Sequence, residues 1–176
     1  MVADAWWLVT FAVMANWQDV EREAPELAAR ARRSFDANKH KTMATLRKDG
    51  APRISGTELD FTNDGLFFGS MWGAVKARDL QRDPRVAFHS ATVDPELVLG
   101  DAKISGRAIE ITDDAVKAAY VAERSEAGNT EAPPEPWHLF RVDVDEVVWT
   151  GIGDPADHLV IESWHDGRGT RRTERR

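Results

Sequence analysis

The sequence predicts a mainly β protein, a barrel of short strands with helices packed against its outside. About seven short stretches have strand character, turn signals separate them at close intervals, and few stretches are helical. With 176 residues, of which 42% are hydrophobic, the chain suits one domain with a sizeable core. No internal repeat or interdomain linker is evident. A single β domain with peripheral helices is therefore expected.

Helices open the predicted domain. Residues 18–23 read as a short helical turn and residues 25–38 as a longer helix. Pro25 occupies a first-turn position, where its missing N–H costs nothing, and Leu27 and Phe35 lie on one helical face. The longer helix is thus expected to pack its apolar side on the barrel.

Three strands joined by tight turns follow. A first strand over 41–47 leads into Lys48-Asp49-Gly50, and Asp-Gly is a strong hairpin signal. The chain returns as a second strand over 53–61, turns at 63–65 and continues as a third strand over 66–70. The second and third strands are expected to pair antiparallel about Asn63-Asp64.

The second half alternates helices and strands. A short helix over 74–82 ends before Pro84, because proline disfavours a helical residue in front of it. Asp113 is a candidate N-cap for a second long helix, and residues 128–136, polar and proline-rich, form the clear loop. The remaining elements are expected at 86–90, 103–111, 115–125, 138–144, 146–152 and 158–164.

The two ends of the chain are expected to differ from the domain at 15–165. Residues 5–15 are apolar but too short to span a bilayer, which needs roughly 20 residues, and no positive charge precedes them. Two interpretations stay open for residues 1–14: a small docking segment, or a non-native or flexible extension with translation starting at Met14, which we favour. Residues 166–176 are a basic tail or an edge strand.

Composition excludes several classes of function. A net charge of −7 argues against nucleic-acid binding, which needs concentrated positive charge. The chain has no cysteine, which fits a cytoplasmic location and removes thiolate chemistry. Its five histidines lack metal-binding spacing, and no nucleophile-elbow motif is present, so neither a metal site nor a hydrolase triad is expected.

Arg53, Ser70 and Lys76 form the most informative constellation. If the strands over 53–61 and 66–70 pair, Arg53 lies near Ser70 and near the N-terminus of the following helix, which Lys76 opens. Unpaired N–H groups and a positive dipole end make a helix N-terminus a natural anion site. A phosphate-bearing cofactor would fit there; the alternative is that both cations are solvated surface residues.

Four segments resemble the pyridoxamine 5′-phosphate oxidase-like family of flavin-binding proteins. They are ATLRKDGAPRIS (44–55), DGLFFGSMWGAVKARDLQRDPRVAF (64–88), DAKISGRAIEI (101–111) and HLFRVDVDEVVW (138–149). The resemblance implies a split β-barrel, a homodimer, and FMN or the related deazaflavin coenzyme F-420 as cofactor. No membrane or nucleic-acid partner is expected.

The resemblance also implies roles for particular residues. Arg53 and Lys76 match phosphate-binding positions, and Gly69 and Ser70 match the strand end near the ribityl phosphate. Ile54 and Ser55 match positions whose backbone follows the flavin ring. Asp101 matches a residue that contacts the ring from the partner subunit. Val75 departs from the family pattern, since an arginine is common there. The C-terminal segment with which true pyridoxamine phosphate oxidases grip their substrate is not recognisable, so that activity is not expected.

The expected function is therefore hydride transfer between a flavin-type cofactor and an unknown small substrate. The cofactor carries such chemistry, so no acid, base or nucleophile of the protein is nominated. Trp72 and Trp137 are candidates to cover a flat ring or to pack in the core. Two alternatives stay open: a deazaflavin-dependent reductase, and a protein that binds flavin or haem without turnover.

Overall fold

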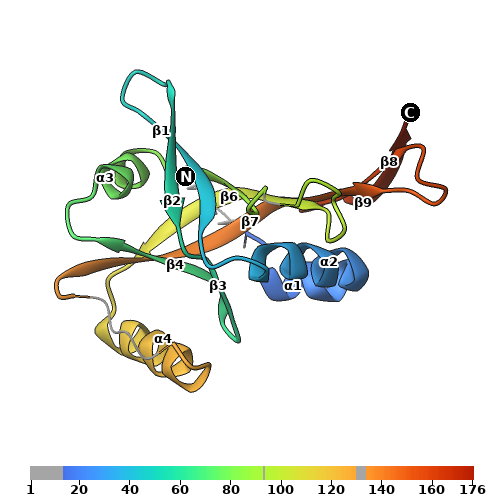
Figure 1. Cartoon of the computed structure of the whole chain (residues 1–176). Coiled ribbons are helices and arrows are strands. Elements are labelled where there is room, and N and C mark those ends of the chain that lie inside the picture. Colours follow the sequence, from blue (N-terminus) through green and yellow to red (C-terminus); the bar gives the residue numbers. More distant parts are fainter. Residues whose placement is uncertain (1–13, 93, 130–133) are drawn as a thin grey trace, which may run out of the picture.

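Four helices surround the sheet in the part of the chain that the structure describes. The computed structural model describes residues 14–92, 94–129 and 134–176 (Figure 1). The expectation for the N-terminal extension falls mostly on residues 1–13, which lie outside this part. The helices are α1 (Trp17–Glu23), α2 (Pro25–Asp36), α3 (Val75–Arg82) and α4 (Asp114–Glu126).

Nine antiparallel strands make up one sheet within the described residues. They are β1 (Lys41–Leu46), β2 (Pro52–Thr57), β3 (Asp60–Thr62), β4 (Gly65–Met71), β5 (Arg85–His89), β6 (Asp101–Ile111), β7 (Trp137–Ile152), β8 (Leu159–His165) and β9 (Gly169–Arg175). The mainly β prediction with peripheral helices is thus confirmed.

The order of the strands explains why the sheet curls. The main path runs β2-β1-β5-β6-β7-β4-β3, so β2 and β3 stand at its opposite ends. Only Glu58 and Leu59 separate these two strands in the sequence. Thr57 and Asp60 are three residue steps apart and therefore lie within about 11 Å of each other, so the two edges must come close together. The result is a barrel whose wall is left without strand pairing between β2 and β4 in the described residues.

The predicted pairing of the strands over 53–61 and 66–70 is wrong in part. The hairpin about Asn63-Asp64 exists, but only Asp60–Thr62 of that second strand pairs with β4. Residues 52–57 form β2, which pairs with β1 instead, with Thr45 opposite Arg53. The chain bends at Glu58-Leu59, where Leu59 is buried in the core. This bend moves Arg53 away from the strand that carries Ser70.

A glycine permits a bulge where two predicted strands are in fact one. Residues 138–144 and 146–152 belong to the single strand β7, whose register with β6 shifts at Ser105/Gly106. A Cβ on Gly106 would overlap the carbonyl oxygen of Asp143. Only glycine lets the two backbones approach so closely at this point. The bulge therefore bends β7 without ending it.

The core lies between the inner face of the sheet and the first two helices. Trp17, Phe35, Phe68, Phe88 and Trp164 are among its fully buried side chains. Helix α2 packs against β6, β7 and β8, and α3 packs against β1 and β6. Helix α4 covers a separate cluster formed by Phe67, Tyr120, Trp137 and Leu139. Each helix thus covers a different part of the barrel.

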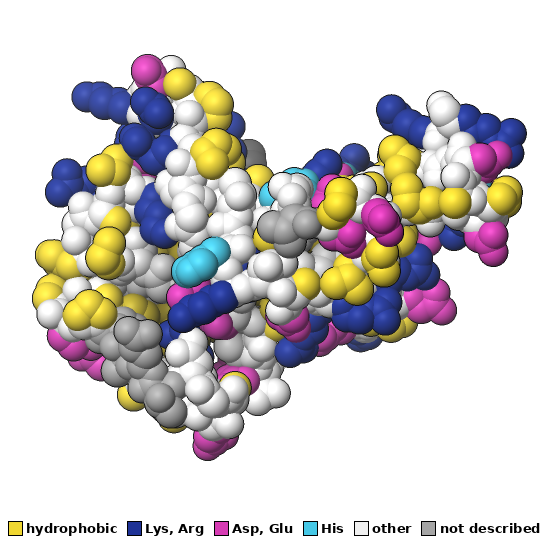
Figure 2. Space-filling view, viewed as in Figure 1, with side chains coloured by type: hydrophobic (Ala, Val, Ile, Leu, Met, Phe, Trp, Pro, Cys, Tyr) yellow, Lys and Arg dark blue, Asp and Glu magenta, His cyan; other side chains and the backbone are white. Residues whose placement is uncertain are grey.

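The C-terminal residues form an edge strand rather than a frayed tail. Strand β9 pairs with β8 along its length, and the β8–β9 hairpin projects from the barrel at the right of Figure 1. Figure 2 shows apolar side chains along this hairpin and Lys and Arg side chains at its end. No helix in the described part of the chain is long and apolar enough to cross a membrane.

Candidate functional site

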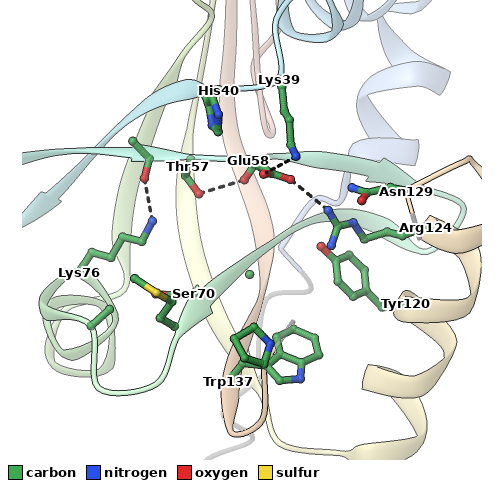
Figure 3. A pocket seen from close by; sticks show the side chains of 15 residues that line it. Lys39, His40, Thr57, Glu58, Ser70, Lys76, Tyr120, Arg124, Asn129 and Trp137 are labelled. Carbon is green, nitrogen blue, oxygen red and sulfur yellow. Dashed lines mark hydrogen bonds and ion pairs between the residues drawn. The ribbon is translucent and has the colours of Figure 1, made fainter. Parts of the chain in front are cut away.

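A cavity of about 460 Å³ opens in the gap between β2 and β4 (Figure 3). Its walls come from the end of β2, the end of β4, the first turn of α3 and the inner side of α4. Cavities that hold small molecules and cofactors are typically about 300–1,000 Å³. The cavity in this gap is therefore large enough to hold a small-molecule ligand.

Three of the residues predicted to bind the cofactor line one side of this cavity: Gly69, Ser70 and Lys76. Ser70 is only 7% exposed, and its hydroxyl group has no hydrogen-bond partner among the described residues. A buried polar atom without a partner costs about 1–3 kcal/mol. The hydroxyl of Ser70 thus has an unused hydrogen bond within the cavity wall. Its oxygen has almost no exposed surface, so the side chain must rotate to present the hydroxyl to a ligand.

Lys76 reaches across from α3 to the end of β2. Its Nζ donates a hydrogen bond to the carbonyl oxygen of Gly56 at 2.8 Å, as the dashed line in Figure 3 shows. Burial lowers the pKa of Lys76 below its usual 10.5, because the ammonium loses water contacts and gains no carboxylate. The amine still has unused donor positions, so an anion beside it would gain both a hydrogen bond and charge.

The first turn of α3 adds backbone donors to this side of the cavity. The helix begins after Ala74, which makes no side-chain cap. The first N–H groups of a helix have no partner within it, and their positive end attracts anions. Together with Ser70 and Lys76, this uncapped turn has the donors that a phosphate needs.

His138 fixes the turn that leads into α3. The N–H of Gly73 donates to Nε2 of His138 at 3.2 Å, and Nδ1 of His138 lies 2.6 Å from Glu110 Oε1. Because Nε2 accepts this hydrogen bond, Nδ1 carries the ring proton and donates a hydrogen bond to Glu110. Trp72 stacks on the imidazole with ring centroids 4.6 Å apart. The Trp72 ring is therefore engaged with His138, whereas Trp137 lines the cavity.

Arg53 is not among the residues that line the cavity. Its Nε donates to Asp79 Oδ2 at 2.6 Å, and Asp79 also accepts from Thr45 and Arg82. Burial alone would raise the pKa of Asp79, but the hydrogen bonds from Arg53, Arg82 and Thr45 outweigh it and lower that pKa. In this chain Arg53 links β2 to α3.

Ile54, Ser55 and Asp101 lie outside the cavity as well. Ser55 shares the inner side of β2 with Arg53, whereas Ile54 points outward and is 68% exposed. The register across β1, β5 and β6 places Asp101 on the same outer face as Ile54. It lies roughly 30 Å along β6 from the end near Ser70, at about 3.3 Å per residue.

Helix α4 contributes cavity residues that the sequence reasoning missed. Tyr120 and Arg124 are one turn apart on α4 and both line the cavity. Arg124 donates to Glu58 Oε2 at 3.0 Å, and Lys39 Nζ lies 3.3 Å from the other Glu58 oxygen. The signal in the sequence was a tyrosine and an arginine at i, i+4 spacing. Glu58 and Lys39 had no comparable signal.

One family model matches most of this chain. The profile of the family described as pyridoxamine 5′-phosphate oxidase matches residues 27–149. A search of curated proteins finds no match. The family profile covers β1 to β6, most of β7 and all of the residues that line the cavity.

Several solved structures share the fold at low sequence identity. A pyridoxamine 5′-phosphate oxidase-related, FMN binding protein from Nostoc punctiforme is 16% identical, with a TM-score of 0.59 over 89% of this chain and 97% of that one. PhzG from Burkholderia lata, in complex with tetrahydrophenazine-1-carboxylic acid, is 16% identical, with a TM-score of 0.59 over 90% and 94%. A heme binding protein from Mycobacterium smegmatis is 17% identical, with a TM-score of 0.53 over 86% and 88%. At these identities the likeness concerns the fold.

Proposed function

Because the chain belongs to the pyridoxamine 5′-phosphate oxidase-like family, we propose that it is an oxidoreductase that holds FMN in the cavity between β2 and β4. The observation that carries the proposal is the unpartnered hydroxyl of Ser70, which lies beside Lys76 and the uncapped first turn of α3. FMN supplies hydride transfer when bound. The protein supplies phosphate binding, orientation and a cavity shaped for substrate.

The phosphate of FMN is assigned to the α3 side of the cavity. Ser70 donates its free hydrogen bond, Lys76 supplies a positive charge, and the N–H groups of the first turn of α3 complete the donor set. Val75, where an arginine is common, is apolar and 52% exposed. Lys76 is therefore the only cation on this side among the described lining residues.

A cofactor titration tests the proposal. FMN, riboflavin, coenzyme F-420 and haemin are each added to the purified protein, and visible absorbance and tryptophan fluorescence are recorded. We expect FMN to bind at least 100-fold more tightly than riboflavin, because only FMN carries the phosphate. Charge-assisted hydrogen bonds are worth about 1.5–3 kcal/mol each, so two of them account for such a ratio.

The other outcomes of this titration are equally informative. Equal affinity for FMN and riboflavin contradicts the phosphate assignment. A stronger complex with coenzyme F-420 identifies a deazaflavin-dependent reductase, and a stronger complex with haemin identifies a haem-binding protein. Either of these results overturns the FMN proposal.

We also propose that a second copy of the chain covers the outer face of the sheet. Ile54, Ile152 and Leu159 lie on this face and are exposed apolar side chains that association would bury. Asp101 shares the face, which is consistent with a role toward a neighbouring subunit rather than toward its own cavity.

Substitution Ile54→Asp tests this association. A charge introduced into an interface costs free energy when it is buried, so we expect the variant to sediment as a monomer while the wild-type chain sediments as a dimer. Val116→Asp is the matched control, because Val116 is also an exposed aliphatic side chain but lies on α4. A monomeric wild-type protein, or a dimer that only Val116→Asp disrupts, contradicts the proposed interface.

A further inference from the structure

The α4 side of the cavity differs in charge from the α3 side. One carboxylate oxygen of Glu58 accepts a hydrogen bond from Arg124 at 3.0 Å. The other oxygen lies 3.3 Å from Lys39 Nζ. Figure 3 shows both cations pointing at this carboxylate. Asp60 lies behind, with Arg124 Nε 3.4 Å from its Oδ2. Buried Lys41 lies near both of these carboxylates and near Asp36, so three carboxylates balance three cations around this side.

Tyr120 is hydrogen-bonded within the same group of side chains. Its hydroxyl donates to Asp60 Oδ2 at 2.5 Å. Burial, followed by the nearby charge of Asp60, raises the pKa of Tyr120 above its usual value of 10, so the phenol stays protonated at neutral pH. The proton that it would offer to an anionic ligand is already used.

The guanidinium of Arg124 is largely paired as well: its Nε has no hydrogen-bond partner among the described residues, but this atom has almost no exposed surface. Its side chain is only 14% exposed and contacts carboxylates of both Glu58 and Asp60. An anion entering here would have to displace Glu58 or lie beside it. Burying a charge without a free partner is costly, and like charges repel. An uncharged polar group meets neither penalty.

We infer that the α4 side of the cavity binds an uncharged polar group of the substrate and discriminates against carboxylates and phosphates, with Glu58 as the residue that sets this preference. The inference rests on the proposed function, which assigns the α3 side to the anionic end of the cofactor. The cavity then has one side selective for an anion and one side selective for a neutral group.

Three isosteric probes of different charge test the inference. Benzoate is an anion, benzamide is neutral and benzamidine is a cation, and all three are planar and nearly equal in size. Their binding is followed by the quenching of tryptophan fluorescence, since Trp137 lines the cavity. In the wild-type protein we expect benzamide to bind at least fivefold more tightly than either charged probe.

Two single substitutions then shift the preference in opposite directions. Glu58→Gln removes one negative charge, so the affinity for benzoate relative to benzamide is expected to rise about tenfold. Arg124→Gln removes one positive charge, so benzamidine is expected to gain about tenfold. If Arg124→Gln fails to fold, the benzoate-to-benzamide ratio in Glu58→Gln alone tests the inference. Glu174→Gln, on the exposed strand β9, is the control that leaves the ranking unchanged.

Several results overturn the inference: a wild-type preference for benzoate, no detectable binding of any probe, or an unchanged ranking in Glu58→Gln. The FMN titration separates these failures from failure of the proposed function. FMN binding with the wrong probe ranking overturns only the inference. The expected ranking without FMN binding overturns only the function.

Discussion

Replacing Lys76 by glutamine is expected to weaken FMN binding by about 10- to 100-fold and to leave riboflavin binding unchanged. A hydrogen bond to a charged group contributes about 1.5–3 kcal/mol, and each 1.4 kcal/mol is tenfold in affinity. Lys76 is the only cation on the α3 side of the cavity among the described lining residues, so no neighbour replaces it. Titration of both flavins into the variant measures the effect.

Arg78→Gln is the matched control for this substitution. Arg78 lies on the same helix but is exposed and does not line the cavity, so FMN affinity should stay within a factor of two or so of wild type. Equal losses in both variants, or a loss of riboflavin affinity in Lys76→Gln, contradict a direct contact between Lys76 and phosphate.

The same lysine gives FMN affinity a pH dependence. Only the protonated amine attracts phosphate, and burial lowers the pKa of Lys76 below its usual 10.5. Affinity should therefore fall as pH rises and should begin to fall below pH 10.5. Lys76→Arg keeps its charge at these pH values, so its affinity should persist where that of the wild type declines.

Replacing Asp79 by asparagine is expected to lower the free energy of unfolding by about 3 kcal/mol. Removing one partner of a buried ion pair costs about 3–5 kcal/mol. The lower end applies because Asp79 is 3% exposed but the side chain of Arg53 is 25% exposed. The carboxylate holds β1, β2 and α3 together through Thr45, Arg53 and Arg82. Urea unfolding of both proteins measures the difference.

At low pH the wild type and Asp79→Asn should no longer differ in their free energy of unfolding. The folded-state pKa of Asp79 lies below its ordinary 3.8, so its contribution is present above pH 3.8 and is lost as pH falls through the lowered pKa. Wild type and variant should therefore converge in acid. Asp83→Asn, at the C-cap of the same helix, removes an ion pair with the exposed side chain of Arg85 and should therefore lose much less stability, because exposed pairs contribute about 0–1 kcal/mol. Similar losses in both variants would assign the effect to α3 helicity.

Local signals in the sequence were sufficient for most of the strands. The Asp49-Gly50 turn and the strand before it are confirmed, and the strand after it is confirmed as far as Thr57. The end of α3 before Pro84 and the cap of α4 by Asp113 are confirmed as well. Each depends on backbone conformations of neighbouring residues. The family resemblance, too, rests on contiguous stretches, and the profile match confirms it.

Contacts between distant residues limited the prediction of the site. The residues from Arg53 to Phe61 read as one strand, and nothing in their spacing marks the bend at Glu58-Leu59 that closes the barrel. The charge of Arg53 can be read from the sequence, but the ion pair between Arg53 and Asp79 depends on which face of α3 packs against β2. Gly69, Ser70 and Lys76 come together because they flank one local connection, the turn from β4 to α3.

The unpaired segment between β2 and β4 has a consequence for kinetics. Other neighbouring strands along the described barrel are joined by backbone ladders, which must break before they separate. At the cavity the opposite walls are linked by side-chain contacts: Lys76 to Gly56, Arg53 to Asp79 and Arg124 to Glu58. Widening this gap costs a few side-chain contacts rather than a backbone ladder. A ligand can therefore enter and leave without unfolding any strand, and its association rate is set by diffusion and orientation rather than by opening of the barrel.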